Sequence, residues 1–347
     1  MDTTTYKCPS CGAALEFSIE KQQWACDFCG NVFSLGDLVG GEAERSEHVH
    51  EDAGVFGGEV TGFRCQSCGA EIIAEKNTAA TFCAYCRSPA IIPSQLGEVR
   101  KPNYILPFKI SKDNAIEIML NKCKRRPLLP LAFRRDIRQG VISGLYVPFW
   151  LFSCDARGFI EAEGDIITRW SDSHFRYTKI DTFLIVRDTD MHVSRVPIDA
   201  SDKMDDAMMH AIEPYDYGHL EPFAMQYLSG HYANSYDMTP NEAIPIGDMR
   251  MDRAVVNVVE GMARKGYTVF RRRRLDIYKR NTVMHYAMMP VWTFVGKFRE
   301  KDYVFSINGQ TGKVSGKLPV SPGRVAAWLS GAFVVFTGLA FALSLVL

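Results

Sequence analysis

Eight of the ten cysteines fall into two sets of four with the same spacing. In each set, two Cys-x2-Cys pairs are separated by fourteen residues, and the sequence around the leading pair also repeats, which indicates an internal duplication. Thiolates at this spacing are typical ligands of a structural metal ion. The first set is Cys8, Cys11, Cys26 and Cys29, and the second is Cys65, Cys68, Cys83 and Cys86.

Each Cys-x2-Cys pair can bind one side of an ion from a tight turn. A glycine after the second cysteine permits the positive φ of such a turn; Gly12, Gly30 and Gly69 occupy this position, and Arg87 replaces the fourth glycine. Two such turns complete a tetrahedral shell of four thiolates. We therefore predict two zinc ribbons, at 1–36 and 62–100, that hold two structural Zn2+ ions and depend on them for folding.

Other interpretations of these cysteines have less support from the sequence. A rubredoxin-like iron centre uses the same four thiolates, so the ligands alone do not separate zinc from iron. Disulfides would require an oxidising compartment, which nothing in the N-terminal sequence indicates, and a thioredoxin-like pair would require a βαβ context. Cys123 and Cys154 lie outside both sets and are interpreted as buried free thiols.

The charge distribution disfavours a protein that coats nucleic acid. The chain carries 40 Lys or Arg and 40 Asp or Glu, but residues 1–100 carry 7 against 14. Half of those acids lie at 37–61, which is interpreted as an acidic flexible linker in which His48 and His50 are solvated. A ribbon that binds nucleic acid should be basic with exposed aromatics, whereas we expect Trp24 and Phe28 to form a small apolar core. Protein binding is therefore favoured.

The composition changes at about residue 101, and 101–320 is predicted to be an α+β platform domain rich in β-structure. Helices are predicted from Ser111 and near 249–265, with several short strands at 157–198. Val147–Phe152 is echoed by Met289–Phe294, which predicts a repeated α-then-β unit at 104–230 and 240–318.

Two short patterns within this domain allow a local prediction. Asn308-Gly309 predicts a type I′ hairpin turn. The basic run Arg271–Arg274 is interpreted as charge that protects a sheet edge, with contact to anionic lipid or an acidic partner as the alternative.

Motifs of common enzymes are missing from the sequence. There is no GxxxxGK[ST] phosphate loop, HExxH, GxSxG or GxGxxG pattern. Met204, Met208, Met209 and His210 are interpreted as packing residues and not as a soft-metal site. We therefore expect a protein without enzymatic activity.

The segment 325–347 is 23 residues without a charge. As a helix it would measure about 35 Å, enough to cross a hydrocarbon core of about 30 Å. With Lys313, Lys317 and Arg324 before it, the sequence predicts a single-pass membrane protein whose N-terminal part is cytoplasmic. The expected fold is thus multidomain, with two ribbons, a platform and one C-terminal transmembrane helix.

The whole pattern resembles a bacterial family of membrane-anchored double zinc-ribbon proteins, the YdjG-like proteins. Genomes often label them as relatives of the primosomal replication helicase or as TFIIB-type zinc-ribbon proteins. The resemblance rests on the two cysteine sets together with Gly144–Phe152, Glu213–Tyr217, Tyr227–Gly230, Met289–Trp292 and Asn308–Val314.

The resemblance implies a function as well as a ligand set. The eight cysteines of the two sets correspond to the ribbon ligands of the family. Its members look like non-enzymatic membrane adaptors that bind SPFH-domain proteins, phage-shock-protein-A-like proteins or a paralogue in envelope stress. The helicase label is not supported, because the ATPase phosphate loop is missing. The expected function is therefore a membrane-anchored zinc-ribbon adaptor that recruits protein partners, and a nucleic-acid-binding membrane tether is the alternative.

Overall fold

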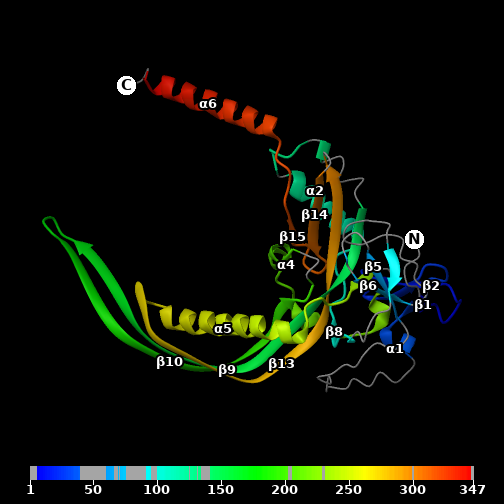
Figure 1. Ribbon diagram of the computed structural model, residues 1–347. Coiled ribbons are helices and arrows are strands. Elements are labelled where there is room, and N and C mark those ends of the chain that lie inside the picture. Colours follow the sequence, from blue (N-terminus) through cyan, green and yellow to red (C-terminus); the bar gives the residue numbers. More distant parts are fainter. Residues whose placement is uncertain are drawn as a thin grey trace.

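The computed structural model shows a curled β-sheet with a small sheet beside its base and a C-terminal helix that extends from its far end (Figure 1). The residues that the structure describes are 6–39, 60–65, 69, 71–75, 91–94, 100–124, 126–130, 132–133, 141–201, 205–228, 231–298 and 301–344.

Four short antiparallel strands form the small N-terminal sheet. They are β1 (Tyr6–Lys7), β2 (Ala14–Ser18), β3 (Gln23–Cys26) and β4 (Val32–Phe33), in that spatial order. Helix α1 (Leu35–Val39) follows them. Leu15, Phe17 and Trp24 are buried and give this sheet its apolar side. The architecture is compatible with the zinc ribbon predicted for 1–36.

The segment predicted as a second ribbon contributes strands to the large sheet. β5 (Val60–Cys65) pairs with both β6 (Glu71–Glu75) and β7 (Ile91–Ser94). β6 in turn pairs with β12 (Tyr232–Asn234), which runs parallel to β9. Cys68, Cys83, Cys86 and most of the linker predicted at 37–61 lie outside the described residues.

Three very long antiparallel strands make the curved arm of the large sheet. β9 (Val141–Ser171) is central, with β10 (Arg176–Asp199) on one side and β13 (Val269–Phe298) on the other. The short strands β8 (Tyr104–Ile105) and β11 (Glu221–Pro222) extend the sheet beside β13. β14 (Lys301–Asn308) and β15 (Val314–Gly316) add an antiparallel hairpin to the end of β13.

Helix α5 (Pro240–Arg264) lies in the curve of the arm (Figure 1). The helix begins with a capping box, in which the side chains of Thr239 and Glu242 each accept a hydrogen bond from the backbone N–H of the other residue. Its buried residues recur every four positions and face the sheet; they are Ala243, Gly247, Met251, Val255, Val259 and Ala263. Glycines allow the close approach, because a Cβ on Gly247 would lie 2.7 Å from the Phe152 ring and one on Gly158 would lie 2.5 Å from Val259.

Helix α2 (Lys112–Lys124) buries Ala115, Met119 and Cys123. Three short helices lie between β10 and β12: α4 (Asp206–Ile212) and the 3-10 helices η1 (Tyr217–His219) and η2 (Met225–Leu228).

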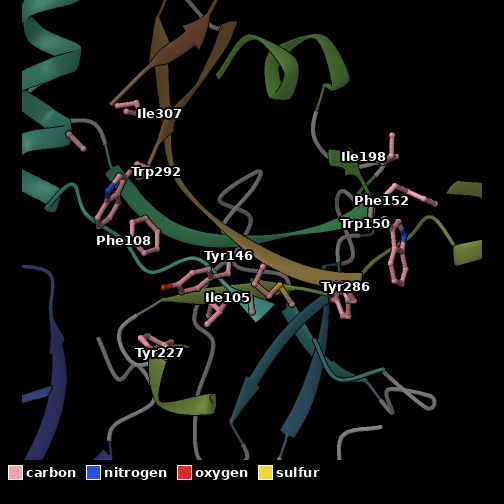
Figure 2. Close-up of a cluster of buried hydrophobic side chains, with 14 of the residues drawn as sticks. Ile105, Phe108, Tyr146, Trp150, Phe152, Ile198, Tyr227, Tyr286, Trp292 and Ile307 are labelled. Carbon is pink, nitrogen blue, oxygen red and sulfur yellow. The ribbon is translucent and has the colours of Figure 1, made fainter. Parts of the chain in front are cut away.

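A continuous aromatic core fills the base of the sheet (Figure 2). Trp150 packs on Tyr286 with ring centroids 5.1 Å apart, and its indole N–H donates to the Met238 carbonyl oxygen at 3.0 Å. Phe108 contacts Trp292 at 4.9 Å between ring centroids. These side chains join β9, β13 and the segment before α2 into one body.

The prediction of a transmembrane helix at 325–347 is wrong. Helix α6 (Pro322–Ser344) covers most of that segment, but within the described part of the chain no helix has both the length and the apolar character that crossing a bilayer requires. Helix α6 begins before the uncharged run and has Arg324 in its first turn, and it is described as far as Ser344. The predicted single-pass topology and membrane localisation depend on this helix, so these two predictions are contradicted as well.

The Arg271–Arg274 run is neutralised by neighbouring carboxylates. Arg271 pairs with Asp165 at 2.8 Å and Arg272 with Glu260 at 2.7 Å, while Arg273 pairs with Glu163. Arg274 pairs with Asp276, one of its neighbours on β13, at 2.7 Å. Each arginine therefore has an anionic partner within the sheet and α5, which accounts for the run without an external ligand.

The hairpin predicted at Asn308-Gly309 is present, but its turn differs from type I′. The loop spans 309–312, and the Asn308 N–H donates to the Lys313 carbonyl oxygen at 2.8 Å. The Asn308 side chain accepts hydrogen bonds from the N–H groups of Gln310 and Thr311, both at 2.9 Å. Positive φ occurs at Gly312, not at Gly309.

Candidate metal centre

Cys8, Cys11, Cys26 and Cys29 converge at one end of the small sheet. Their four sulfur atoms all lie within 4.8 Å of one another, and the Cys8–Cys29 and Cys11–Cys26 Sγ pairs are 3.6 Å apart. Four sulfurs at about 2.3 Å from a tetrahedral zinc ion would lie about 3.8 Å apart, so the observed spacing fits such an ion. The first predicted ligand set therefore forms a cluster that could hold a metal ion.

The backbone turns that present these thiols repeat one geometry. The N–H of Gly12 donates to the Cys8 carbonyl oxygen, and the N–H of Gly30 donates to that of Cys26, both at 2.8 Å. Both glycines have φ above 70°, and a Cβ at either would meet nothing within 4 Å. Glycine is therefore needed here for its conformation and not for space.

The described part of the second set shows the same turn. The Gly69 N–H donates to the Cys65 carbonyl oxygen at 2.8 Å, and Gly69 has a φ of 72°. Cys65 is buried. Because its three partner cysteines lie outside the described residues, a second metal cluster is not shown and remains a prediction.

The thiols of the first cluster differ in pKa because each has a different set of hydrogen bonds with the backbone and with the other thiols. Burial raises the pKa of Cys8, but hydrogen bonds from the N–H groups of Ser10 and Cys11 and from neighbouring thiols outweigh it and bring that pKa to about 7. A bond from the Ala13 N–H lowers the pKa of Cys11, yet burial and the adjacent thiols raise it to about 12. A divalent cation would replace the protons that hold the remaining sulfurs neutral.

The ribbon is attached to the body by aromatic contacts. The Trp24 ring lies 5.1 Å from Phe17 and 5.0 Å from Tyr227 of η2, and Phe17 lies 5.3 Å from Tyr227. The Trp24 indole N–H donates to the Gln226 carbonyl oxygen at 3.0 Å. The Gln22 amide donates to the Phe108 carbonyl oxygen at 2.9 Å, so the β2–β3 hairpin is bound to the body at two points.

The two aromatics of the ribbon have opposite environments, which corrects one expectation. Trp24 is 2% exposed and belongs to the core, as predicted, whereas Phe28 is 82% exposed. Spacing could not separate them, because the partner that buries Trp24 lies about two hundred residues later in the chain at Gln226–Tyr227. The one sequence signal for this contact is Tyr227 itself, an aromatic residue in the segment Tyr227–Gly230 that supports the family resemblance.

The other candidate residues do not form a site in the described part of the chain. Cys123 and Cys154 are both buried, and burial raises the pKa of Cys154. Met209 is buried, and Met208 accepts a hydrogen bond from Ser306 at 3.1 Å. His48 and His50 lie outside the described residues.

Comparisons with known proteins give one clear relationship. No known protein-family profile matches the chain, and no solved structure matches it. The chain is 32% identical over 327 residues to a Bacillus subtilis (strain 168) protein described as the uncharacterized protein YdjG. The similarity spans 94% of this chain and 93% of the relative. The chain therefore belongs to the YdjG family.

Proposed function

We propose that this protein is a non-enzymatic adaptor whose metal-loaded N-terminal ribbon docks a protein partner. The observation that supports this best is Phe28, an 82% exposed aromatic side chain between two of the clustered cysteines. Exposed aromatic residues on rigid supports are the usual energetic centres of protein interfaces.

The support under Phe28 is rigid. It lies in the turn between Cys26 and Cys29, where the Gly30 N–H bonds to the Cys26 carbonyl oxygen. A zinc ion on the four thiolates would hold this turn in place. Trp24 of the same ribbon contacts Tyr227 of η2 and donates a hydrogen bond to Gln226, so Phe28 would be presented by the whole body and not by a free module.

The exposed charges of the ribbon favour a protein partner over a nucleic acid. Asp27 and Glu20 are exposed on the ribbon, together with Lys7 and Lys21. A phosphate backbone requires a basic surface, which this balanced surface does not provide. A partner with an apolar pocket for Phe28 and a polar rim fits better.

The resemblance of the sequence supports particular partners. SPFH-domain proteins, phage-shock-protein-A-like proteins or a paralogue are the partners we propose, with a role in envelope stress. We further propose that the bound ion is zinc, and that the second cysteine set binds a second ion.

The alternative function is nucleic-acid binding, and the exposure of Phe28 is the one observation that favours it. An exposed ring can stack on an unpaired base and contribute about 1–3 kcal/mol. Such binding would weaken steeply as salt increases.

Site-specific photo-cross-linking tests the proposal. A benzophenone amino acid replaces Phe28 in the full chain, and the matched control places it at Phe175, which is 65% exposed at the turn between β9 and β10. We expect position 28 alone to capture a discrete protein in cells, which mass spectrometry identifies. Capture of nucleic acid at position 28 would support the alternative, and equal capture at both positions would contradict a ribbon-specific docking surface.

A further inference from the structure

Strand β10 forms one edge of the curved arm. Within the described part of the chain it pairs with β9 alone, and the β9–β10 hairpin extends beyond the C-terminal end of α5 (Figure 1). An edge strand directs every second N–H and C=O group away from its sheet, where another strand can pair with it. The bulge of β10 lies between Val193 and Val196, so the strand is regular from its start as far as Val193.

Four large apolar side chains are exposed within seven residues of this edge strand. Their exposed fractions are 57, 44, 65 and 46%, for Ile180, Phe183, Leu184 and Val186. Burial of apolar surface is the main favourable contribution to protein association. The other edge of the arm, on β13, differs because it begins with the ion-paired run Arg271–Arg274, and charge commonly protects a free edge. β10 is therefore the edge of the arm that favours a partner strand.

The sequence of β10 is complementary to itself in antiparallel order. When Leu184 lies opposite Leu184 of a second copy, Asp181 lies opposite the partner's Arg187. The two-fold symmetry of such a contact repeats this ion pair on the other side of Leu184. Phe183 then lies opposite the partner's Ile185. Directly opposite side chains of antiparallel strands lie on the same face, and apolar pairs and pairs of opposite charge stabilise the pairing.

The neighbouring registers lack this charge complementarity. A register centred on Phe183 would place Lys179 opposite Arg187, and like charges directly opposite each other destabilise a pair of strands. A register centred on Ile185 would place Arg187 opposite Phe183. Asp181 also contacts Lys179 of its own strand at 2.9 Å, but a carboxylate accepts hydrogen bonds from more than one cation. Of these three registers, the one centred on Leu184 is the most favourable.

Both faces of β10 would gain contacts in this register. Phe183 lies on the face that Tyr267 covers, with 6.0 Å between the two ring centroids. Thr182 lies on the opposite face, where it donates to Asp165 at 2.8 Å. Because side chains alternate along a strand, Leu184 lies on the same face as Thr182. The Phe183–Ile185 contacts and the Leu184–Leu184 contact would therefore form on opposite sides of the joined sheet.

We propose that two copies of this chain associate through antiparallel pairing of their β10 strands, with Leu184 on the two-fold axis. The pairing spans Thr178–Asp190 and joins the two arms into one continuous sheet, and the turn that contains Phe175 lies beyond it. A contact of this kind is isologous and closes after two copies. It also covers an edge that could otherwise add strands without limit.

Sedimentation equilibrium of the full chain tests this proposal, and we expect a dimer. Leu184→Asp places two like charges together on the axis and should raise the dimer dissociation constant at least tenfold. Because Leu184 is 65% exposed in one copy, this variant should keep the fold, which circular dichroism verifies. The matched control is Tyr278→Asp, which adds the same charge at a 62% exposed position on β13 and should leave the dissociation constant unchanged.

Charge exchange tests the register. Arg187→Asp and Asp181→Arg each place like charges opposite each other, so each variant alone should dimerise at least tenfold more weakly than the wild type. A mixture of the two variants restores both pairs of opposite charge and should form a heterodimer with nearly the wild-type affinity. A mixture that associates as weakly as the separate variants would overturn the proposal.

Two other results would also overturn it. A wild-type chain that stays monomeric at all accessible concentrations would exclude pairing with a second copy. A wild-type dimer that Leu184→Asp leaves intact would place the interface elsewhere, for example on exposed apolar side chains of α6 such as Trp328, which is 61% exposed.

Discussion

Replacement of Trp24 by alanine should loosen metal binding although no metal ligand is changed. Trp24 is buried, contacts Phe17 and Tyr227, and donates a hydrogen bond to Gln226. Truncation of a buried aromatic side chain of this size costs about 3–5 kcal/mol. In a small ribbon, metal binding is coupled to folding, so a loss of folding free energy appears as a loss of metal-binding free energy. At about 1.4 kcal/mol per tenfold change, the apparent metal dissociation constant should rise by about two to three and a half orders of magnitude.

The matched control is Phe28→Ala in the same ribbon. Its side chain is 82% exposed, so its removal should change the metal affinity by less than about threefold. The assay is competition with a chromogenic chelator, performed on the full chain with Cys83 and Cys86 replaced by serine so that only the first set binds. Equal metal affinities for the two alanine variants would refute the reasoning that links the aromatic contact to the metal cluster.

Three further predictions concern stability and metal binding. Gly247→Ala should destabilise the protein by about 1–3 kcal/mol, because the new Cβ would lie 2.7 Å from the Phe152 ring, whereas Gly261→Ala in the same helix meets nothing within 4 Å and should stabilise it by up to about 1 kcal/mol; urea unfolding measures both. Burial lowers the pKa of His231 to about 4 from 6.5, so below pH 6.5 the unfolded state binds a proton that the folded state does not. The free energy of unfolding should therefore fall by about 2 kcal/mol between pH 7 and pH 5, and His231→Gln should remove this decrease; an unchanged slope in that variant would contradict it. Gly12→Ala forces a Cβ into the left-handed region, at a cost of about 1–2 kcal/mol, and should weaken metal binding about tenfold in the chelator assay.

Local spacing was enough to predict the first ligand set. The geometry of two Cys-x2-Cys turns is encoded within a few residues, and Gly12 and Gly30 supply the positive φ that the turns need. The positions of α2 and of the main part of α5 could be predicted for the same reason, since their apolar residues recur at helical spacing. The start of α5 was missed, because Pro240 and Pro245 interrupt that pattern.

Features that depend on distant contacts could not be predicted. The strands expected at 157–198 were short, yet β9 and β10 form one long hairpin with a bulge near Arg195, which has a φ of 57°. Glycines such as Gly158 and Gly164 are typical of turns, but here they lie within β9, where the missing side chain leaves room for Val259 and Tyr267. These contacts join segments about a hundred residues apart, and no local pattern contains them.

The C-terminal prediction failed for a related reason. The prediction of a membrane span rests on the absence of charge over 325–347. The helix itself begins earlier, at Pro322, and its Arg324 donates hydrogen bonds to the loop after α2. These hydrogen bonds join the first turn of α6 to the body of the protein, and the composition of 325–347 could not predict them.

X-ray absorption at the zinc edge tests the central claim most directly, because it reports the ligands of the bound ion. In the full chain with Cys83 and Cys86 replaced by serine, we expect one zinc equivalent with four sulfur ligands at about 2.3 Å, and its loss when Cys8 and Cys11 are also replaced. A folded protein that purifies without metal, or a zinc ion bound mainly by nitrogen or oxygen, would contradict the account.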